Sequence, residues 1–222
     1  KGAVHSSLNH SSSDQRFRFQ FSTNYTSDSN SLPGRDLTSR AYSLAPNAPE
    51  LYNDLGKLNW EGGTFNNPLA VLEGQYHTAN TNLLANSLLS YQLVPGLQLK
   101  ASMGYNETTL SQTITSPLSI YNPFDTSTHQ ASLYIANGKG TSWILEPQLN
   151  YTKKIHRLDL DLLLGSTFQN QETTRLAQMG SGFTSDALIN NMKAASTITM
   201  INHEVVEFRY NAAFSRLNLK WD

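Results

Sequence analysis

Three absences narrow the classes of protein to which this sequence can belong. The 222 residues include no cysteine, which excludes disulfide frameworks, thiol nucleophiles and cysteine-based zinc sites. There is no run of Lys or Arg and the formal net charge is -1, so we expect no nucleic-acid partner. No apolar run approaches the roughly 20 residues of a helical membrane span. Helical membrane proteins are therefore excluded.

Side chains that carry chemistry are sparse as well. The six histidines show no metal-ligand spacing with one another or with a carboxylate, so we predict neither a metal site nor a cofactor. Asp159 and Asp161 stand at i and i+2 of an expected strand, where paired carboxylates could perform acid/base catalysis. We favour instead charges that line a water-filled interior. A β-rich hydrolase would need a catalytic arrangement that the sequence does not show, and we predict that the chain is not an enzyme.

What the sequence does contain is apolar residues at every second position, the period of a β-strand. Only 38% of the residues are hydrophobic and 15% are charged, so many of the intervening positions are uncharged and polar. We predict six strands, at residues 17–26, 80–94, 96–108, 141–152, 158–168 and 204–221. The apolar phase changes within the last strand, and we expect a β-bulge near Ser215 to reconcile its two halves.

The connections between these strands alternate in length. Pro95-Gly96 is a tight turn, and the charged turn from Lys153 to Arg157 is another. The remaining connections are long, at about fifty, thirty and thirty residues, whereas compact soluble domains usually have connections of a few residues. Outer-membrane barrels combine short periplasmic turns with long extracellular loops. We therefore predict an all-β fold, an antiparallel transmembrane β-barrel segment with its short turns on the periplasmic side.

Aromatic residues favour the same interpretation, because they gather at the two interfaces of a membrane. Tyr91 and Tyr151 precede the short turns, while Tyr105, Trp143 and Phe168 lie next to the long loops. We predict that these five residues form two membrane-interface rings.

Several stretches together resemble the SusC/RagA-type TonB-dependent outer-membrane transporters. They run in order along most of the chain: residues 44–49 (LAPNAP), 58–60 (LNW), 65–70 (FNNPLA), 143–151 (WILEPQLNY) and 182–188 (GFTSDAL). The resemblance implies a bacterial outer-membrane location in contact with lipid, nutrient import with glycans as the main cargo and peptides as another, a SusD-like surface lipoprotein as partner, and energy from the TonB complex through a plug. We recognise neither the plug nor a TonB-contacting segment, and we expect residues 1–222 to be part of a longer barrel.

Aromatic residues among many amides mark the long loops, and a ring flanked by amides suits an oligosaccharide. The candidates for ligand binding are Tyr52, Trp60, Tyr76, Tyr121 and Phe124. Packing of the loops on themselves, or contact with a partner protein, is the alternative that we favour for these rings. For the whole chain, the alternative is a secreted all-β carbohydrate-binding or adhesin domain.

Overall fold

The computed structural model describes residues 1–221 as one antiparallel sheet of seven strands. Each strand pairs with its neighbours in sequence, in the order β1 to β7. The strands are β1 (Gly2–Ser11), β2 (Phe17–Pro33), β3 (Gln75–Val94), β4 (Leu97–Ser116), β5 (Ser132–Ile155), β6 (Leu158–Ser181) and β7 (Thr197–Trp221).

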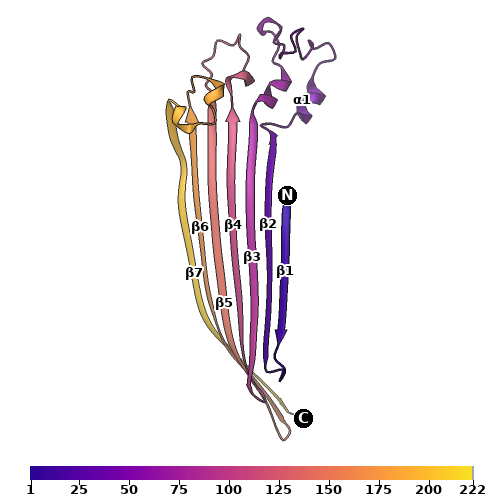
Figure 1. Ribbon diagram of the computed structural model, residues 1–222, viewed down its shortest axis with the longest axis vertical. Helices are drawn as coiled ribbons and strands as arrows, with labels where there is room; N and C mark the ends of the chain where they lie inside the picture. Colours follow the sequence, from indigo (N-terminus) through magenta and orange to yellow (C-terminus); the bar gives the residue numbers. More distant parts are fainter. Residues whose placement is uncertain (222) are drawn as a thin grey trace.

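The predicted all-β, antiparallel fold is confirmed, together with its alternation of turns and loops. Figure 1 shows the short turns gathered at one end of a curved sheet and the long loops at the other. At the Pro95-Gly96 turn, the Thr152 N–H donates a hydrogen bond of 2.8 Å to the Gly96 carbonyl. Gly96 has a φ of 86°, which only glycine adopts freely.

One strand was missed, because β1 carries little sequence signal. Val4 and Leu8 are its main apolar residues, with serine and histidine between them. The strand exists because it pairs along its whole length with β2, from Gly2 opposite Ser27 to Ser11 opposite Arg18. The prediction of six strands was wrong by this one.

The predicted loops were too long, because the strands continue past the end of their apolar alternation. The observed loops comprise residues 34–74, 117–131 and 182–196. The added strand residues are mostly uncharged and polar, as in the last part of β4, which is rich in Thr and Ser. Where both faces of a strand meet water, no alternation of apolar and polar residues is required. Sequence periodicity therefore marks only the lower part of each strand.

The predicted bulge near Ser215 was also wrong. Pairing between β6 and β7 is regular there, with Leu164 opposite Ser215 and Gly165 opposite Phe214. The register shifts instead between Ala177 and Gln178, close to the loops. The change of phase means that apolar residues stand on both faces of β7.

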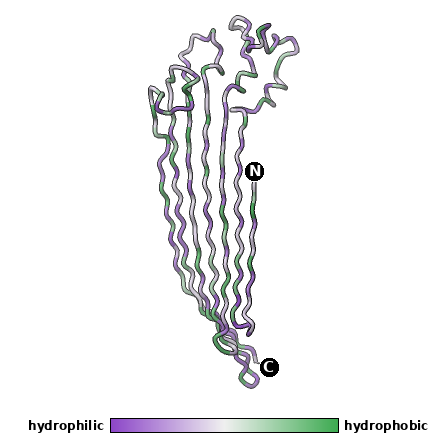
Figure 2. Tube along the Cα trace, in the orientation of Figure 1, coloured by the Kyte–Doolittle hydropathy of each residue, from purple (hydrophilic) through white to green (hydrophobic). Residues whose placement is uncertain are grey.

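The register assigns the side chains of the sheet to two faces, since residues directly opposite each other share a face. The apolar face carries the alternating Phe, Leu and Ile residues of the lower strands, such as Phe19, Leu89, Leu99, Leu149 and Leu162. The mixed face carries Gln98, Lys100, Ser102 and Asp161, together with the aromatic residues Phe208, Tyr210 and Phe214. Figure 2 shows hydrophilic and hydrophobic residues interspersed along every strand.

The helical segments all lie in the long loops. They are α1 (Thr38–Ser43), η1 (Glu61–Gly63), η2 (Pro68–Glu73), η3 (Leu118–Ile120), η4 (Asp186–Leu188) and η5 (Met192–Ala194). Over residues 1–221, none of the helices has the length and apolar content needed to cross a membrane. A small buried core forms where loop 182–196 folds over the top of β5, bringing Phe183 and Ile189 onto Ala131 and Leu133.

Candidate functional site

The longest loop, residues 34–74, is organised by asparagine side chains. Asn67 is buried, and its amide donates hydrogen bonds to the Leu51 carbonyl at 2.6 Å and the Asn59 carbonyl at 3.0 Å. Its side-chain oxygen accepts from the Leu69 N–H at 2.9 Å, which begins η2. Asn53 accepts two backbone hydrogen bonds, from Leu55 and Lys57, in the same manner. Asparagine suits these positions because its short amide both donates and accepts.

The second loop, residues 117–131, is organised around Asp125. Its carboxylate accepts hydrogen bonds from the Ser127 N–H at 2.9 Å and the Ser127 hydroxyl at 2.7 Å, and lies 3.0 Å from His129 Nε2. The backbone hydrogen bond from Ser127, followed by those from His129 and the Ser127 hydroxyl, holds the pKa of Asp125 well below its ordinary value. The His129 ring stacks on Tyr121, with ring centroids 4.0 Å apart and planes 6° from parallel. Both rings are thereby fixed in position.

Polar contacts tie the loops to each other. The Asn122 amide donates to the Gly63 carbonyl at 3.2 Å and to the Asn66 side chain at 3.3 Å, joining the first two loops. From the third loop, the Asp186 carboxylate accepts from the N–H groups of Leu118 at 2.7 Å and Ser119 at 3.3 Å. The second loop is held on both sides.

A cleft of about 800 Å³ lies between the first two loops. Three of the five predicted ligand-binding aromatics line it: Tyr52, Trp60 and Tyr121. Titratable side chains of both signs lie among the lining residues, namely Lys57, Glu73, Asp125 and His129. The cleft thus offers flat rings, amides and charges of both signs to a ligand.

The other two predicted aromatics lie elsewhere. Tyr76 is the second residue of β3, opposite Ile114 on the mixed face. Phe124 is 60% exposed and packs against Gly63, where a β-carbon would lie 2.6 Å from the Phe124 Cβ. Neither residue lines the cleft, so a role for them in binding remains a prediction.

Sequence reasoning missed several residues of the cleft. The Asp125-x-Ser127 spacing is a turn signal, in which an aspartate bonds the backbone two residues on, and it was available in the sequence. Asn122 and Asp186 act across 56 and 68 residues respectively. No local pattern marks such contacts.

The five predicted interface aromatics all lie on the apolar face, in two rows. Tyr105 stands opposite Trp143, with Phe168 two pairs lower, opposite Leu145. Near the turns, Tyr91 stands opposite Leu99 and Tyr151 opposite Leu97. The eight-residue step from Trp143 to Tyr151 corresponds to roughly 27 Å along a strand. A tilted strand of that length matches an apolar band about 25 Å tall.

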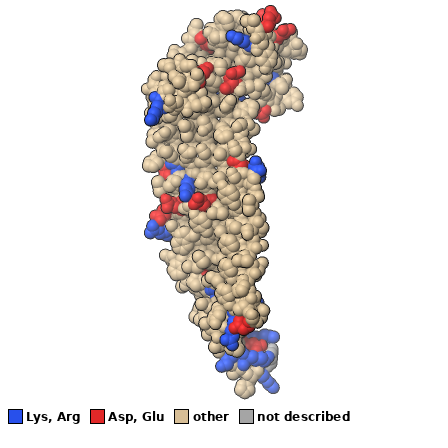
Figure 3. Space-filling view, viewed as in Figure 1, with Lys and Arg blue, Asp and Glu red and all other residues tan. Residues whose placement is uncertain are grey.

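Five charged residues gather on the apolar face at the upper aromatics and directly above them: Arg209 in the row of Tyr105 and Trp143, Glu107, Glu172 and Glu207 in the next row, and Lys139 in the row beyond. The Tyr105 hydroxyl donates to Glu107 Oε2 at 2.8 Å, and Lys139 Nζ lies 3.2 Å from the same oxygen. Figure 3 shows charged side chains gathered at mid-height, at the turn end and in the loops, with mostly uncharged surface between. We call these five residues the charged row.

The mixed face holds the two carboxylates considered for catalysis. Asp159 Oδ1 lies 3.7 Å from Lys154 Nζ, and Asp161 Oδ2 lies 3.9 Å from Arg216 Nη2. Each carboxylate therefore has a cation on a neighbouring strand. Over residues 1–221, no group of three or more metal-ligating side chains is placed to hold an ion.

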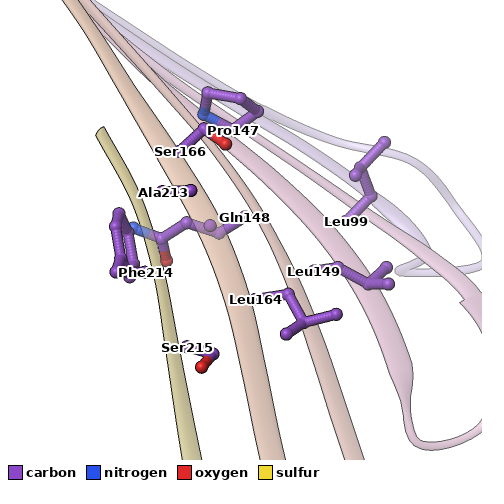
Figure 4. Close-up of a pocket in the computed structure, with 10 residues that line it drawn as sticks. Leu99, Pro147, Gln148, Leu149, Leu164, Ser166, Ala213, Phe214 and Ser215 are labelled. Carbon is purple, nitrogen blue, oxygen red and sulfur yellow. The ribbon is translucent and has the colours of Figure 1, made fainter. Parts of the chain in front are cut away.

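Small residues open grooves in the apolar face. Figure 4 shows one groove across β4 to β7, with Leu99, Leu149 and Leu164 projecting beside the short side chains of Ala213 and Ser215. Phe214 lies on the opposite side of β7, where its ring covers Gly165. A second groove crosses β2 to β5.

Solved structures of other proteins have the same architecture. A structure of the RagAB peptide transporter matches 99% of this chain with a TM-score of 0.71 at 18% identity. Two structures of the RagAB peptide importer, in its open-open and closed-closed states, match with TM-scores of 0.73 and 0.70 at 19% identity. The chain has the fold of part of a SusC-like TonB-dependent transporter.

The predicted resemblance to SusC/RagA-type transporters is thus confirmed as a likeness of fold. This chain spans 26% of the length of each of the three solved chains. No family model matches the sequence, and no curated protein matches it.

Proposed function

We propose that the chain forms barrel wall and extracellular loops of a TonB-dependent importer in the bacterial outer membrane. The observation that carries this proposal is the apolar face of the single sheet, bounded by two aromatic rows and then by the charged row. A soluble sandwich or adhesin domain would cover such a face with a second sheet. A barrel wall leaves it to lipid and turns the mixed face toward the interior.

The remaining parts of the importer belong to the same proposal. Residues 1–222 supply wall and loops, while a plug and a TonB-contacting segment lie elsewhere in the full-length protein. A SusD-like lipoprotein covers the loop end. The likeness to RagAB structures over 99% of the chain supports this arrangement.

For the cargo we propose peptides. The matched structures are described as peptide transporters and importers, and the cleft combines Lys57 with Glu73 and Asp125. A peptide carries charges of both signs at its termini, so a cleft with both signs complements it. Glycans, the cargo predicted from the sequence, are the second candidate, because Tyr52, Trp60 and Tyr121 offer rings among amides.

The test is uptake by cells that express the full-length protein. Labelled short peptides and labelled oligosaccharides are supplied separately, with and without an uncoupler of the proton motive force. We expect peptides to accumulate and the uncoupler to abolish this. Accumulation of oligosaccharides but not of peptides would show that the cargo is a glycan. Absence of the protein from the outer-membrane fraction would overturn the whole proposal.

A pair of loop variants connects the cleft to uptake. Trp60→Ala removes a ring that lines the cleft, and we expect uptake to fall at limiting cargo concentration. Tyr42→Ala removes a ring that is 89% exposed in α1 and outside the cleft. We expect uptake to be unchanged in that control. Equal effects of the two variants on uptake would show that the cleft has no specific role in transport.

A further inference from the structure

The second groove of the apolar face lies in the middle of the sheet and has a volume of about 380 Å³. Ser87 and Ala85 of β3 form its floor, and Phe21 stands on one side of them in β2. On the other side stand the larger residues of β4 and β5: Met103, Tyr105, Trp143 and Leu145. Both β3 and β4 are hydrogen-bonded to neighbours on both edges, so the walls of the groove are complete.

The groove is an apolar site. An apolar cavity of about 150 Å³ is enough to hold a benzene ring, so this groove has room for a stretch of hydrocarbon chain. In a membrane, however, a lipid chain gains little hydrophobic free energy from such a groove, because the surrounding tails are equally apolar. Selectivity for one lipid must therefore come from the polar groups at the end of the groove.

Those groups begin at the upper end of the groove with Tyr105, Glu107 and Lys139. Glu107 accepts from the Tyr105 hydroxyl and pairs with Lys139, which fixes all three side chains above the groove. The Lys139 side chain is 54% exposed and that of Glu107 is 32% exposed, so the ammonium is the more accessible group. A lysine ammonium has three donors and binds phosphate oxygens.

Hydroxyl groups follow on the same face of the strands beyond this point. In the three rows above Glu107, the apolar-face positions of β2, β3 and β4 carry hydroxyls at Ser27, Ser29, Ser31, Thr81, Thr109, Ser111 and Thr113, and the other two positions are Ala79 and His77. Thr81 and Thr109 share a hydrogen bond between their hydroxyls. Hydroxyls both donate and accept, as the hydroxyls of a sugar do.

We propose that this groove holds one acyl chain of a phosphorylated glycolipid of the outer leaflet, with its phosphate at Lys139 and its sugar along the hydroxyl-bearing strand ends. The order of chemistry along the wall, from apolar groove to cation to hydroxyls, is the order of chain, phosphate and sugar in such a lipid. This proposal rests on the outer-membrane location of the proposed function.

The experiment measures lipid retained by the purified full-length transporter, using native mass spectrometry after incubation with lipid A. Phosphatidylglycerol, which has acyl chains and a phosphate but no sugar, serves as the parallel probe. We expect retention of lipid A, and its loss in Ala85→Trp, in which an indole fills the groove. The matched control is Ala101→Trp, on the same face but lower in the sheet, between Leu89 and Pro147. That variant should retain lipid A.

The role of Lys139 is tested by reversing its charge and by replacing it with another cation. We expect Lys139→Glu to reduce lipid A retention and Lys139→Arg to preserve it. Retention by Ala85→Trp equal to that of the unmodified protein would overturn the proposal, as would retention of phosphatidylglycerol equal to that of lipid A. Peptide uptake and membrane fractionation, measured on the same variants, report separately on the proposed function. If the groove variants showed normal peptide uptake and unaltered lipid A retention, the lipid site in the groove would be refuted while the proposed function would stand.

Discussion

The single side chain of Asn67 holds together distant parts of the loop formed by residues 34–74. Its three hydrogen bonds join residues that are up to 16 positions apart, and the side chain is buried. A buried carbonyl left without a donor costs about 1–3 kcal/mol. The order of loop 34–74 therefore depends strongly on one amide.

Asn67→Asp tests this dependence sharply. Aspartate keeps the acceptor for the Leu69 N–H but loses both donors to the Leu51 and Asn59 carbonyls. We expect local destabilisation of about 2–3 kcal/mol, seen as faster backbone hydrogen exchange across residues 50–70. The control is Asn47→Ala at an exposed position, which should exchange as the unmodified protein does. Unchanged exchange in Asn67→Asp would show that other contacts order the loop.

Gly96 is the second residue with a specific structural demand. Besides its positive φ, a β-carbon there would collide with the Thr152 carbonyl oxygen. We predict that Gly96→Ala lowers the free energy of unfolding by about 1–3 kcal/mol, measured as a lower thermal midpoint of the folded barrel on heated electrophoresis.

The control for Gly96 is another glycine of the same sheet. Gly138, within β5, has no neighbour closer than 3.8 Å to an added β-carbon. Gly138→Ala should leave the midpoint unchanged or raise it slightly, because alanine loses less backbone entropy on folding. Equal loss in both variants would mean that the turn geometry is not the cause.

At the scale of elements, the second loop depends on the ionisation of Asp125. A carboxyl with a lowered pKa in the folded state stabilises that state while it is ionised. The stabilisation is complete above the ordinary value of 3.8 and disappears as the pH falls through the lower, folded value. We expect the loop to remain ordered down to pH 4 and to loosen only in stronger acid.

This pH dependence is checked by the fluorescence or NMR signals of Tyr121, which stacks on His129. In Asp125→Ala the transition should be absent and the loop loosened even at neutral pH. A transition that persists in that variant would assign the effect to another group.

The elements also show how far the sequence reveals the fold. The Pro95-Gly96 turn and the lower part of β3, β4, β5 and β6 were predictable, because one face there is apolar and a period of two is enforced. The upper strand ends and β1 were not, since water on both faces, or weakly apolar residues, removes that constraint. The fold there comes from pairing with a neighbouring strand, which no local pattern encodes.

The candidate site was predictable only in part, for a related reason. Tyr52, Trp60 and Tyr121 were recognisable as loop aromatics, yet what brings them to one cleft is a set of contacts between loops. The ties from Asn122 and Asp186 join residues more than 50 positions apart. Such contacts follow from the tertiary fold and not from local composition.

At the scale of the whole molecule, the central claim is that the apolar face meets lipid while the mixed face meets water. The roles assigned to the two aromatic rows, to the charged row and to the groove across β2 to β5 all depend on this assignment of the two faces. The change of chemistry at Glu107 further sets the outer edge of the membrane, so the upper strand ends project beyond it.

The most direct measurement is nitroxide accessibility along β4 of the full-length transporter in a bilayer. The described chain has no cysteine, so single cysteines at positions 97–109 each provide one label site within it. We predict that lipid-soluble oxygen reaches labels at 97, 99, 101, 103 and 105, that a water-soluble nickel complex reaches those between them, and that the preference for oxygen ends at 107. A reversed phase, or no alternation along the strand, would contradict the account.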